Sequence, residues 1–171
     1  TIDSVINKFP GEVAVVHGNC QKENIRTILI PFTVDIHAML ATEIAPALLD
    51  YFKCKLKILL IYEPETTQKE REERENKVHE LVKANSLQAE ILIIKDTDIL
   101  KGIVDESKNA DLLLMGGRTG DFLELLFGRS LAQEITEQSA CPVVWVKEYE
   151  EREPFWKLLL KAPKQVGVEN G

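Results

Sequence analysis

The sequence lacks any apolar run near the roughly 18 residues that a membrane-spanning helix needs, and it has no secretory signal pattern. It has few cysteines, and the three are odd in number and widely spaced: Cys20, Cys54 and Cys141. Neither a disulfide framework nor a zinc site is expected from them. Basic residues are outnumbered, since 21 Lys and Arg stand against 28 Asp and Glu and give a formal net charge of −7. We therefore expect a cytosolic protein that binds no nucleic acid.

Patterns typical of catalysis and of metal binding are also missing. His17, His37 and His79 have no ligand spacing with one another or with the cysteines. No paired acid and base and no activated nucleophile can be assigned. The sequence therefore predicts no metal site and no enzyme.

What the sequence does contain is enough apolar material for one core, since 44% of its 171 residues are hydrophobic. Short apolar runs predict strands at 27–32, 55–62, 89–95, 111–115 and 142–146. Periodic segments between them predict helices at 36–52, 67–84, near 99–104 and from residue 131 onward. Strands that alternate with helices predict an α/β fold with an open, mainly parallel five-stranded sheet.

The predicted helix 67–84 is dominated by charge. Glu70 with Arg74 and Glu73 with Lys77 stand four residues apart, a spacing that favours ion pairs on one helix face. A charge run of this kind is typical of a solvated surface helix.

A glycine-rich segment follows the fourth predicted strand. Gly117, Gly120 and Gly128 lead to Ser130, which forms an S-x-x-Q capping box with Gln133 and so predicts a helix start. Glycines let the backbone turn with positive φ and approach an anion closely, and a helix N-terminus offers unpaired N–H groups. The segment predicts a phosphate cradle, although a connection between strand and helix also needs glycines for its turn alone.

The position of this segment favours a ligand site. Open parallel sheets bind ligands at the carboxyl ends of the strands where the strand order reverses, and the predicted strands 27–32 and 111–115 would flank that point. Asp35 follows the first of them, where it serves either as a helix cap or as a ligand contact.

The N-terminus repeats one local pattern. Residues 6–16 resemble residues 135–146, a helix end followed by a strand, with the strand segments 130 residues apart. Either two such junctions look alike by chance, or residues 1–18 are the last unit of a preceding copy. We accordingly divide the chain into an N-terminal extension at 1–24, a domain at 25–148 and a tail at 149–171.

Several motifs together resemble the universal stress protein family: Ile30-Pro31 ending the first strand, the loop Gly117-Arg-Thr-Gly120, the segment Phe127-Gly-Arg-Ser130, and the entry Cys141-Pro-Val-Val144 to the last strand. The resemblance covers about residues 25–148. It implies an open sheet of strand order 3-2-1-4-5 with helices on both faces, often dimeric through the last strand. It also implies ATP binding through a motif of G-x-x-G, nine residues and then G-[ST].

The resemblance implies a nucleotide site made of Pro31, Thr33, Asp35, Gly117, Arg118, Gly120, Gly128, Arg129 and Ser130. The chain departs from the family motif, because seven residues instead of nine separate Gly120 from Gly128, and Arg129 interrupts the final Gly-Ser pair. Thr33 stands where the family has a nucleotide-contacting aspartate. Arg129 would bring a charge to a phosphate. Binding of ATP, binding of another nucleotide such as AMP or a cyclic dinucleotide, and binding of no nucleotide all stay open.

The expected function is therefore a nucleotide-sensing regulatory domain, with a dimerisation or scaffold module that has lost nucleotide binding as the alternative and a slow nucleotide hydrolase as a third. The resemblance extends to domains appended to bacterial transporters. Together with Thr1 in place of an initiator Met, it predicts the cytosolic C-terminal part of a membrane transporter, held at the inner face of the membrane. The predicted partners are a second copy, through strand 142–146, and the transport domain of the same polypeptide. The segment 154–161 is either a short interfacial helix or packs against the domain.

Overall fold

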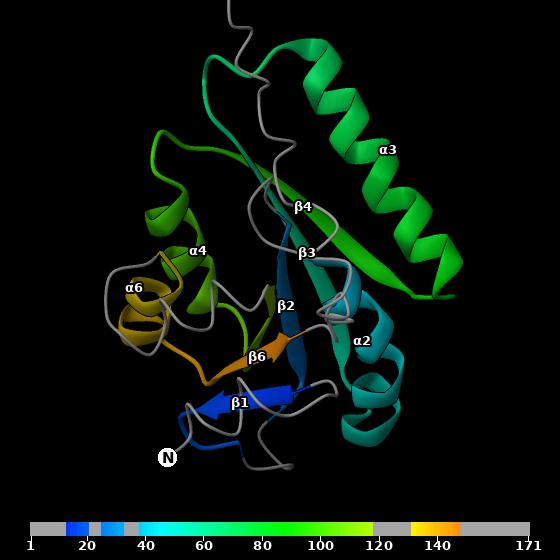
Figure 1. The fold of residues 1–171 in the computed structure, drawn as a ribbon, viewed down its shortest axis with the longest axis vertical. Helices are drawn as coiled ribbons and strands as arrows, with labels where there is room; N and C mark the ends of the chain where they lie inside the picture. The colour runs from blue at the N-terminus through cyan, green and yellow to red at the C-terminus, as the bar shows by residue number, and fades with distance from the viewer. Residues whose placement is uncertain (1–12, 21–24, 33–37, 118–130, 148–171) are drawn as a thin grey trace, which may run out of the picture.

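The computed structural model describes residues 13–20, 25–32, 38–117 and 131–147 (Figure 1). These residues form a six-stranded sheet in the order β1-β6-β5-β2-β3-β4. Its strands are Val13–His17 (β1), Thr27–Phe32 (β2), Lys55–Tyr62 (β3), Ala89–Lys95 (β4), Leu112–Gly117 (β5) and Val143–Lys147 (β6). The helices are Ala38–Phe52 (α2), Gln68–Ala84 (α3), Ile99–Ser107 (α4) and Leu131–Gln138 (α6).

Five of the strands confirm the predicted order. β4, β3, β2, β5 and β6 lie side by side in that sequence, and each neighbouring pair is parallel. The expected number of strands is wrong, because β1 adds a sixth strand that runs antiparallel along β6. In the expected order 3-2-1-4-5, strand 142–146 is the last strand and therefore a sheet edge, but β1 covers that edge. An apolar edge strand with open backbone groups is a template for pairing, so a segment that can add to it is stabilised there.

Helices cover both faces of the sheet, as expected for this topology. Figure 1 shows α2 and α3 on one side of the sheet and α4 and α6 on the other. One core cluster lies beneath α2 and α3, and a second lies beneath α4 and α6. Because β2 and β3 are covered on both faces, they read as continuous apolar runs and not as alternating patterns.

The helix boundaries follow local signals in most places. Thr67 caps α3, and α6 begins at Leu131, directly after Ser130, which lies outside the described residues. α4 continues to Ser107, beyond the predicted end. The buried Ser107 hydroxyl donates to the Val104 carbonyl over 2.6 Å and accepts from the Ala140 N–H over 2.9 Å, which joins the end of α4 to the segment entering β6.

Candidate nucleotide site at the carboxyl ends of the strands

The structure places two of the residues predicted to form the nucleotide site. Pro31 lies near the carboxyl end of β2, and Gly117 is the last residue of β5. Both residues are buried. The remaining predicted residues lie outside the described part of the chain: Thr33, Asp35, Arg118, Gly120, Gly128, Arg129 and Ser130.

β2 and β5 meet at the point where the strand order reverses. From β2 the chain continues to β3 on one side, while β5 occupies the other side. Helices that leave neighbouring strands toward opposite faces leave space between the strand ends, and ligands of open sheets bind there. The carboxyl ends of β2 and β5 therefore lie at the position where the sequence predicts the ligand site.

Pro31 accounts for an early end to the pairing of these two strands. The Arg26 carbonyl accepts from Lys55 N beside β3, whereas the Thr27 carbonyl accepts from Asp111 N beside β5. Since backbone groups alternate sides along a strand, Pro31 turns its nitrogen toward β5. That nitrogen has no hydrogen, so it cannot bond to β5.

The pairing pattern agrees with this reasoning. β2 pairs with β3 from Thr27 to Phe32 but with β5 only at Ile28–Leu112 and Leu29–Leu113. The carboxyl ends of β2 and β5 thus continue beyond their shared ladder. Past Leu29 and Leu113 the two strands no longer pair with each other, although β2 stays paired with β3 and β5 with β6. The backbone groups that β2 and β5 turn toward each other are therefore unpaired across the predicted ligand position.

Asp111 holds β2 and β5 together at their amino ends. Its Oδ2 accepts hydrogen bonds from the backbone N–H groups of Arg26 and Thr27, each at 2.9 Å. The side chain thus bonds β2 just before β5 begins. This anchor compensates for the short ladder and fixes the two strands relative to each other.

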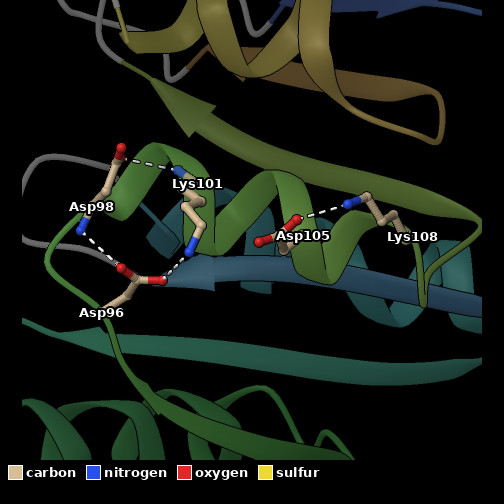
Figure 2. A network of polar contacts seen from close by, with 5 residues as sticks. All are labelled: Asp96, Asp98, Lys101, Asp105 and Lys108. Carbon is tan, nitrogen blue, oxygen red and sulfur yellow. Dashed lines mark hydrogen bonds and ion pairs between the residues drawn. The ribbon is translucent and has the colours of Figure 1, made fainter.

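Two helix N-termini at this edge of the sheet are already occupied by the protein's own side chains. At α3, the Thr67 hydroxyl accepts from Glu70 N, and the Glu70 carboxylate accepts from Thr67 N at 2.8 Å. At α4, Asp98 Oδ1 accepts from Lys101 N at 3.0 Å (Figure 2). Capping of this kind satisfies the N–H groups that an anion would use.

Figure 2 also shows that the charged side chains at the start of α4 bond to groups of the same segment. Asp96 Oδ1 accepts from Asp98 N at 3.1 Å, and Asp96 Oδ2 lies 3.5 Å from Lys101 Nζ. The backbone hydrogen bond from Asp98, together with the Lys101 ammonium, lowers the pKa of the Asp96 carboxyl. An anionic ligand is therefore unfavourable at the α4 start. The starts of α2 and α6 remain at this edge, and the glycine segment precedes α6 in the sequence.

Two arginines at the carboxyl end of β3 were missed by the sequence analysis. The guanidinium carbons of Arg71 and Arg74 lie 5.6 and 5.8 Å from the centre of the Tyr62 ring, within cation–π range. Within the described part of the chain, neither arginine forms an ion pair. The Arg71 Nε is buried and has no hydrogen-bond partner there.

The capping box explains why Arg74 is available. The sequence predicted an ion pair between Glu70 and Arg74, but the Glu70 carboxylate turns back to Thr67 and accepts from both its N–H and its hydroxyl. Those bonds to Thr67 lower the pKa of Glu70. The T-x-x-E pattern at 67–70 was the signal that could have revealed this orientation.

Tyr62 between these arginines is neutral at physiological pH. Burial and the neighbouring Glu75 carboxylate raise the pKa of Tyr62 to about 12. Its hydroxyl donates to Glu75 Oε1 at 3.3 Å and lies 3.2 Å from the Arg71 carbonyl oxygen. The cluster around Tyr62 thus holds two guanidinium groups and one carboxylate, at the same sheet edge as Pro31 and Gly117.

Other kinds of site find no support among the described residues. None of their His, Cys, Asp and Glu side chains gather in a group of three that could hold a metal ion. A hollow of about 650 Å³ lies at the amino ends of β3 and β4, beside Pro46, Cys54 and Leu87, and so on the edge opposite the predicted site. No helix within the described ranges is both long and apolar enough to span a membrane.

No family model and no curated protein matches the sequence. Solved structures do. A universal stress protein in complex with cAMP is 17% identical, with a TM-score of 0.59 over 73% of this chain and 98% of that protein. A universal stress protein from Archaeoglobus fulgidus DSM 4304 is 18% identical, with a TM-score of 0.61 over 88% of this chain and 54% of that one.

The cytoplasmic domain of a prokaryotic cation chloride cotransporter is also similar, at 16% identity and a TM-score of 0.60 over 88% of this chain and 59% of that one. At these identities the likeness concerns the fold. The strand order, the helices on both faces and the switch point between β2 and β5 agree with that likeness. The chain has the universal stress protein fold.

Proposed function

We propose that this chain is a nucleotide-sensing regulatory domain that binds an adenine nucleotide at the carboxyl ends of β2 and β5. The main support for the proposal is the short ladder between these strands. It stops at Leu29 and Leu113 because Pro31 has no N–H to continue it. Backbone groups released from pairing at a switch point can bond a ligand. A protein of similar fold was solved with cAMP, which supports an adenine nucleotide as the class of ligand.

The phosphates would lie on the glycine segment and the first turn of α6. The residues proposed for this contact are Gly117, Arg118, Gly120, Gly128, Arg129 and Ser130. Thr33 and Asp35, which follow β2, would face the ribose or the base. Arg71 and Arg74 add positive charge at the same edge, where they would attract an anionic ligand.

The site is proposed to sense and not to catalyse. Nucleotide binding would favour one arrangement of residues 116–130 and so one arrangement of a neighbouring domain. We further propose that the chain is the cytosolic C-terminal part of a membrane transporter. The likeness to a cotransporter's cytoplasmic domain supports this assignment.

Isothermal titration calorimetry with ATP, AMP, cAMP and a cyclic dinucleotide tests the proposal, followed by a phosphate-release assay with the nucleotide that binds. One nucleotide should bind and should not turn over. Gly120→Val should abolish binding, because a branched side chain blocks close approach of the backbone to a phosphate. Absence of binding at millimolar concentration for all four nucleotides would refute the proposal.

The arginines allow a matched comparison on one helix. Arg71→Gln and Arg74→Gln should each weaken binding about 3- to 10-fold through loss of one positive charge near the ligand. Lys77→Gln removes the same charge from an exposed position of α3 and should leave affinity unchanged. Equal effects of all three variants would mean that the arginines act only through net charge.

Pro31→Ala tests the observation on which the proposal depends. Alanine restores an N–H that faces β5 and lets the ladder extend, so affinity should fall while the free energy of unfolding changes by at most about 1 kcal/mol. Unchanged affinity in this variant would separate the end of the ladder from ligand binding.

A scaffold module without a ligand is the second candidate. The short spacing of seven residues between Gly120 and Gly128 favours it, because the phosphate loop would be tighter than in the family motif. Failure of all four nucleotides to bind, together with retained association to a transport domain, would support this candidate.

A further inference from the structure

Two arginines and a lysine gather on one face of the sheet at the carboxyl ends of β3 and β4. The guanidinium carbons of Arg71 and Arg74 lie 5.6 and 5.8 Å from the centre of the Tyr62 ring. Lys95 ends β4 and is the register partner of Tyr62. Side chains directly opposite each other on neighbouring strands leave the same face of the sheet, so Lys95 emerges beside Tyr62.

These three cations have no carboxylate partner among the described residues. The carboxylates of α3 beside the arginines are each bonded to another group: Glu70 to Thr67, Glu72 to Gln68, Glu73 to Lys69, and Glu75 to the Tyr62 hydroxyl. The cluster of Arg71, Arg74 and Lys95 therefore carries three positive charges beside the single carboxylate of Glu75.

Arg71 is held in place while its outer nitrogens stay available. Its Nε is buried and has no hydrogen-bond partner in the described part of the chain. The residue as a whole is half-buried, and its terminal nitrogens reach the solvent without a hydrogen-bond partner among the same residues. A buried donor without a partner is rare and costly in native proteins. Contact with the Tyr62 ring offsets part of that cost and restricts the positions of the guanidinium.

The charge and the donor groups of this cluster match a phosphate. Guanidinium groups present N–H donors in a fork that fits phosphate oxygens, and an ammonium adds a point charge. Three cations beside the Glu75 carboxylate leave an excess of two positive charges, which a phosphate dianion neutralises and a monoanion does not.

We propose that Arg71, Arg74 and Lys95 form a second anion site, which binds a phosphate group carrying two negative charges. This site goes beyond the proposed nucleotide site and does not require it. Tyr62 ends β3 and Gly117 ends β5, with β2 between them, so the two strand ends lie about 10 Å apart. The phosphate belongs either to a free phosphomonoester or to a further phosphate group of a bound nucleotide.

Nuclear magnetic resonance of the arginine Nε–Hε groups tests the site directly. Phenyl phosphate carries close to two negative charges at pH 7, whereas phenyl sulfate has the same ring and a single charge. Phenyl phosphate should shift the Arg71 and Arg74 signals along a saturating curve at constant ionic strength. Phenyl sulfate should bind at least about 5-fold more weakly.

Substitutions separate a directed site from net charge. Arg71→Gln and Arg74→Gln should each weaken binding of phenyl phosphate about 5- to 10-fold, and Lys95→Gln about 2- to 3-fold because Lys95 is exposed. Lys83→Gln removes the same charge from an exposed position at the other end of α3 and should leave binding unchanged. Arg71→Lys keeps the charge but loses the fork, so it should weaken binding as well. Circular dichroism verifies that each variant is folded.

Gly120→Val distinguishes the two sources of the phosphate. Phenyl phosphate should bind to this variant as it binds to the parent, because the cluster does not include the glycine segment. If ATP but not AMP shifts the Arg71 signal of the parent, and Gly120→Val removes that shift, the phosphate comes from the nucleotide. Binding of phenyl phosphate to a parent that binds no nucleotide would refute the nucleotide site alone and support a free phosphomonoester.

Three results would overturn the second anion site. The first is the absence of a saturating shift at Arg71 and Arg74 with phenyl phosphate up to about 20 mM. The second is equal binding of phenyl phosphate and phenyl sulfate. The third is an equal loss of binding in Arg71→Gln and Lys83→Gln, which would mean that only the net charge of the protein attracts the anion.

Discussion

Removal of the Asp111 carboxylate should destabilise the protein by an amount that its geometry predicts. Asp111 lies in the segment entering β5, and a single oxygen, Oδ2, accepts both the Arg26 and the Thr27 N–H at 2.9 Å. The ladder that joins β5 to β2 contains only two residue pairs. The side chain therefore supplies a large share of the bonding between these strands.

Asp111→Ala removes both hydrogen bonds. The N–H groups of Arg26 and Thr27 are then either hydrated or without a partner. With about 1–1.5 kcal/mol for each bond at a partly exposed position, the free energy of unfolding should fall by about 2–3 kcal/mol. Asp111→Asn keeps a carbonyl oxygen where Oδ2 lies, so both bonds can persist without the charge. It should cost about 1 kcal/mol.

Urea unfolding followed by far-ultraviolet circular dichroism measures both values. With a slope near 2 kcal/mol per molar urea, the midpoint of Asp111→Ala should shift by about 1 M, at an unchanged slope. Hydrogen exchange should show faster exchange at the amides of Arg26 and Thr27 in that variant alone. Asp105→Ala, which removes an exposed carboxylate paired with Lys108, is the control and should unfold like the parent.

Equal destabilisation by Asp111→Ala and Asp111→Asn would refute the reasoning, because it would mean that the charge and not the two hydrogen bonds matters. A loss below about 0.5 kcal/mol in Asp111→Ala would also refute it. In the second case the β2–β5 pair would be held by its ladder and by core packing, without a contribution from the Asp111 side chain.

Three further predictions concern other parts of the fold. Burial and the nearby Asp111 carboxylate raise the pKa of the Cys141 thiol to about 11. Iodoacetamide should therefore alkylate Cys141 slowly at pH 7.5 and faster as the pH rises toward 11, as followed by mass spectrometry. Rapid alkylation at pH 7.5 would contradict this. Gly102→Val should lower the free energy of unfolding, measured in urea, by about 1–3 kcal/mol, because the Cβ alone would lie 2.8 Å from Ile61 Cδ1. An unchanged midpoint of urea unfolding would mean that the Ile61 side chain moves aside at little cost. The lowered pKa of Asp96 means that its carboxylate stabilises the fold above the pKa of the unfolded chain, near 4, and that this contribution is lost as the pH falls through the folded value. In Asp96→Asn the melting temperature should therefore fall less steeply with decreasing pH than in the parent.

Much of the fold was predictable because its signals are local. The predicted bounds of β2 and β3 coincide with the observed ones, since a strand buried on both faces needs a continuous apolar segment. The start of α3 follows Thr67, whose capping box with Glu70 involves residues three apart. The order of the parallel strands came from the family resemblance and is confirmed.

Part of the candidate site was predictable in the same way. The position of Pro31 near the end of β2 could be placed from the sequence, and so could that of Gly117 after an apolar run. The further residues of the site lie outside the described part of the chain, so those assignments stay predictions.

Only the tertiary structure decided which distant segments meet. The sequence showed that residues 13–16 and 143–146 are alike, but likeness does not say that they pair, because a strand's partner is set by long-range register and by the edge that is left open. The approach of Arg71 and Arg74 to Tyr62 likewise depends on how α3 lies across the end of β3. The nitrogen of Pro31 turns toward β5 and not toward β3 because of the register of β2 between these two neighbours, which no local pattern encodes.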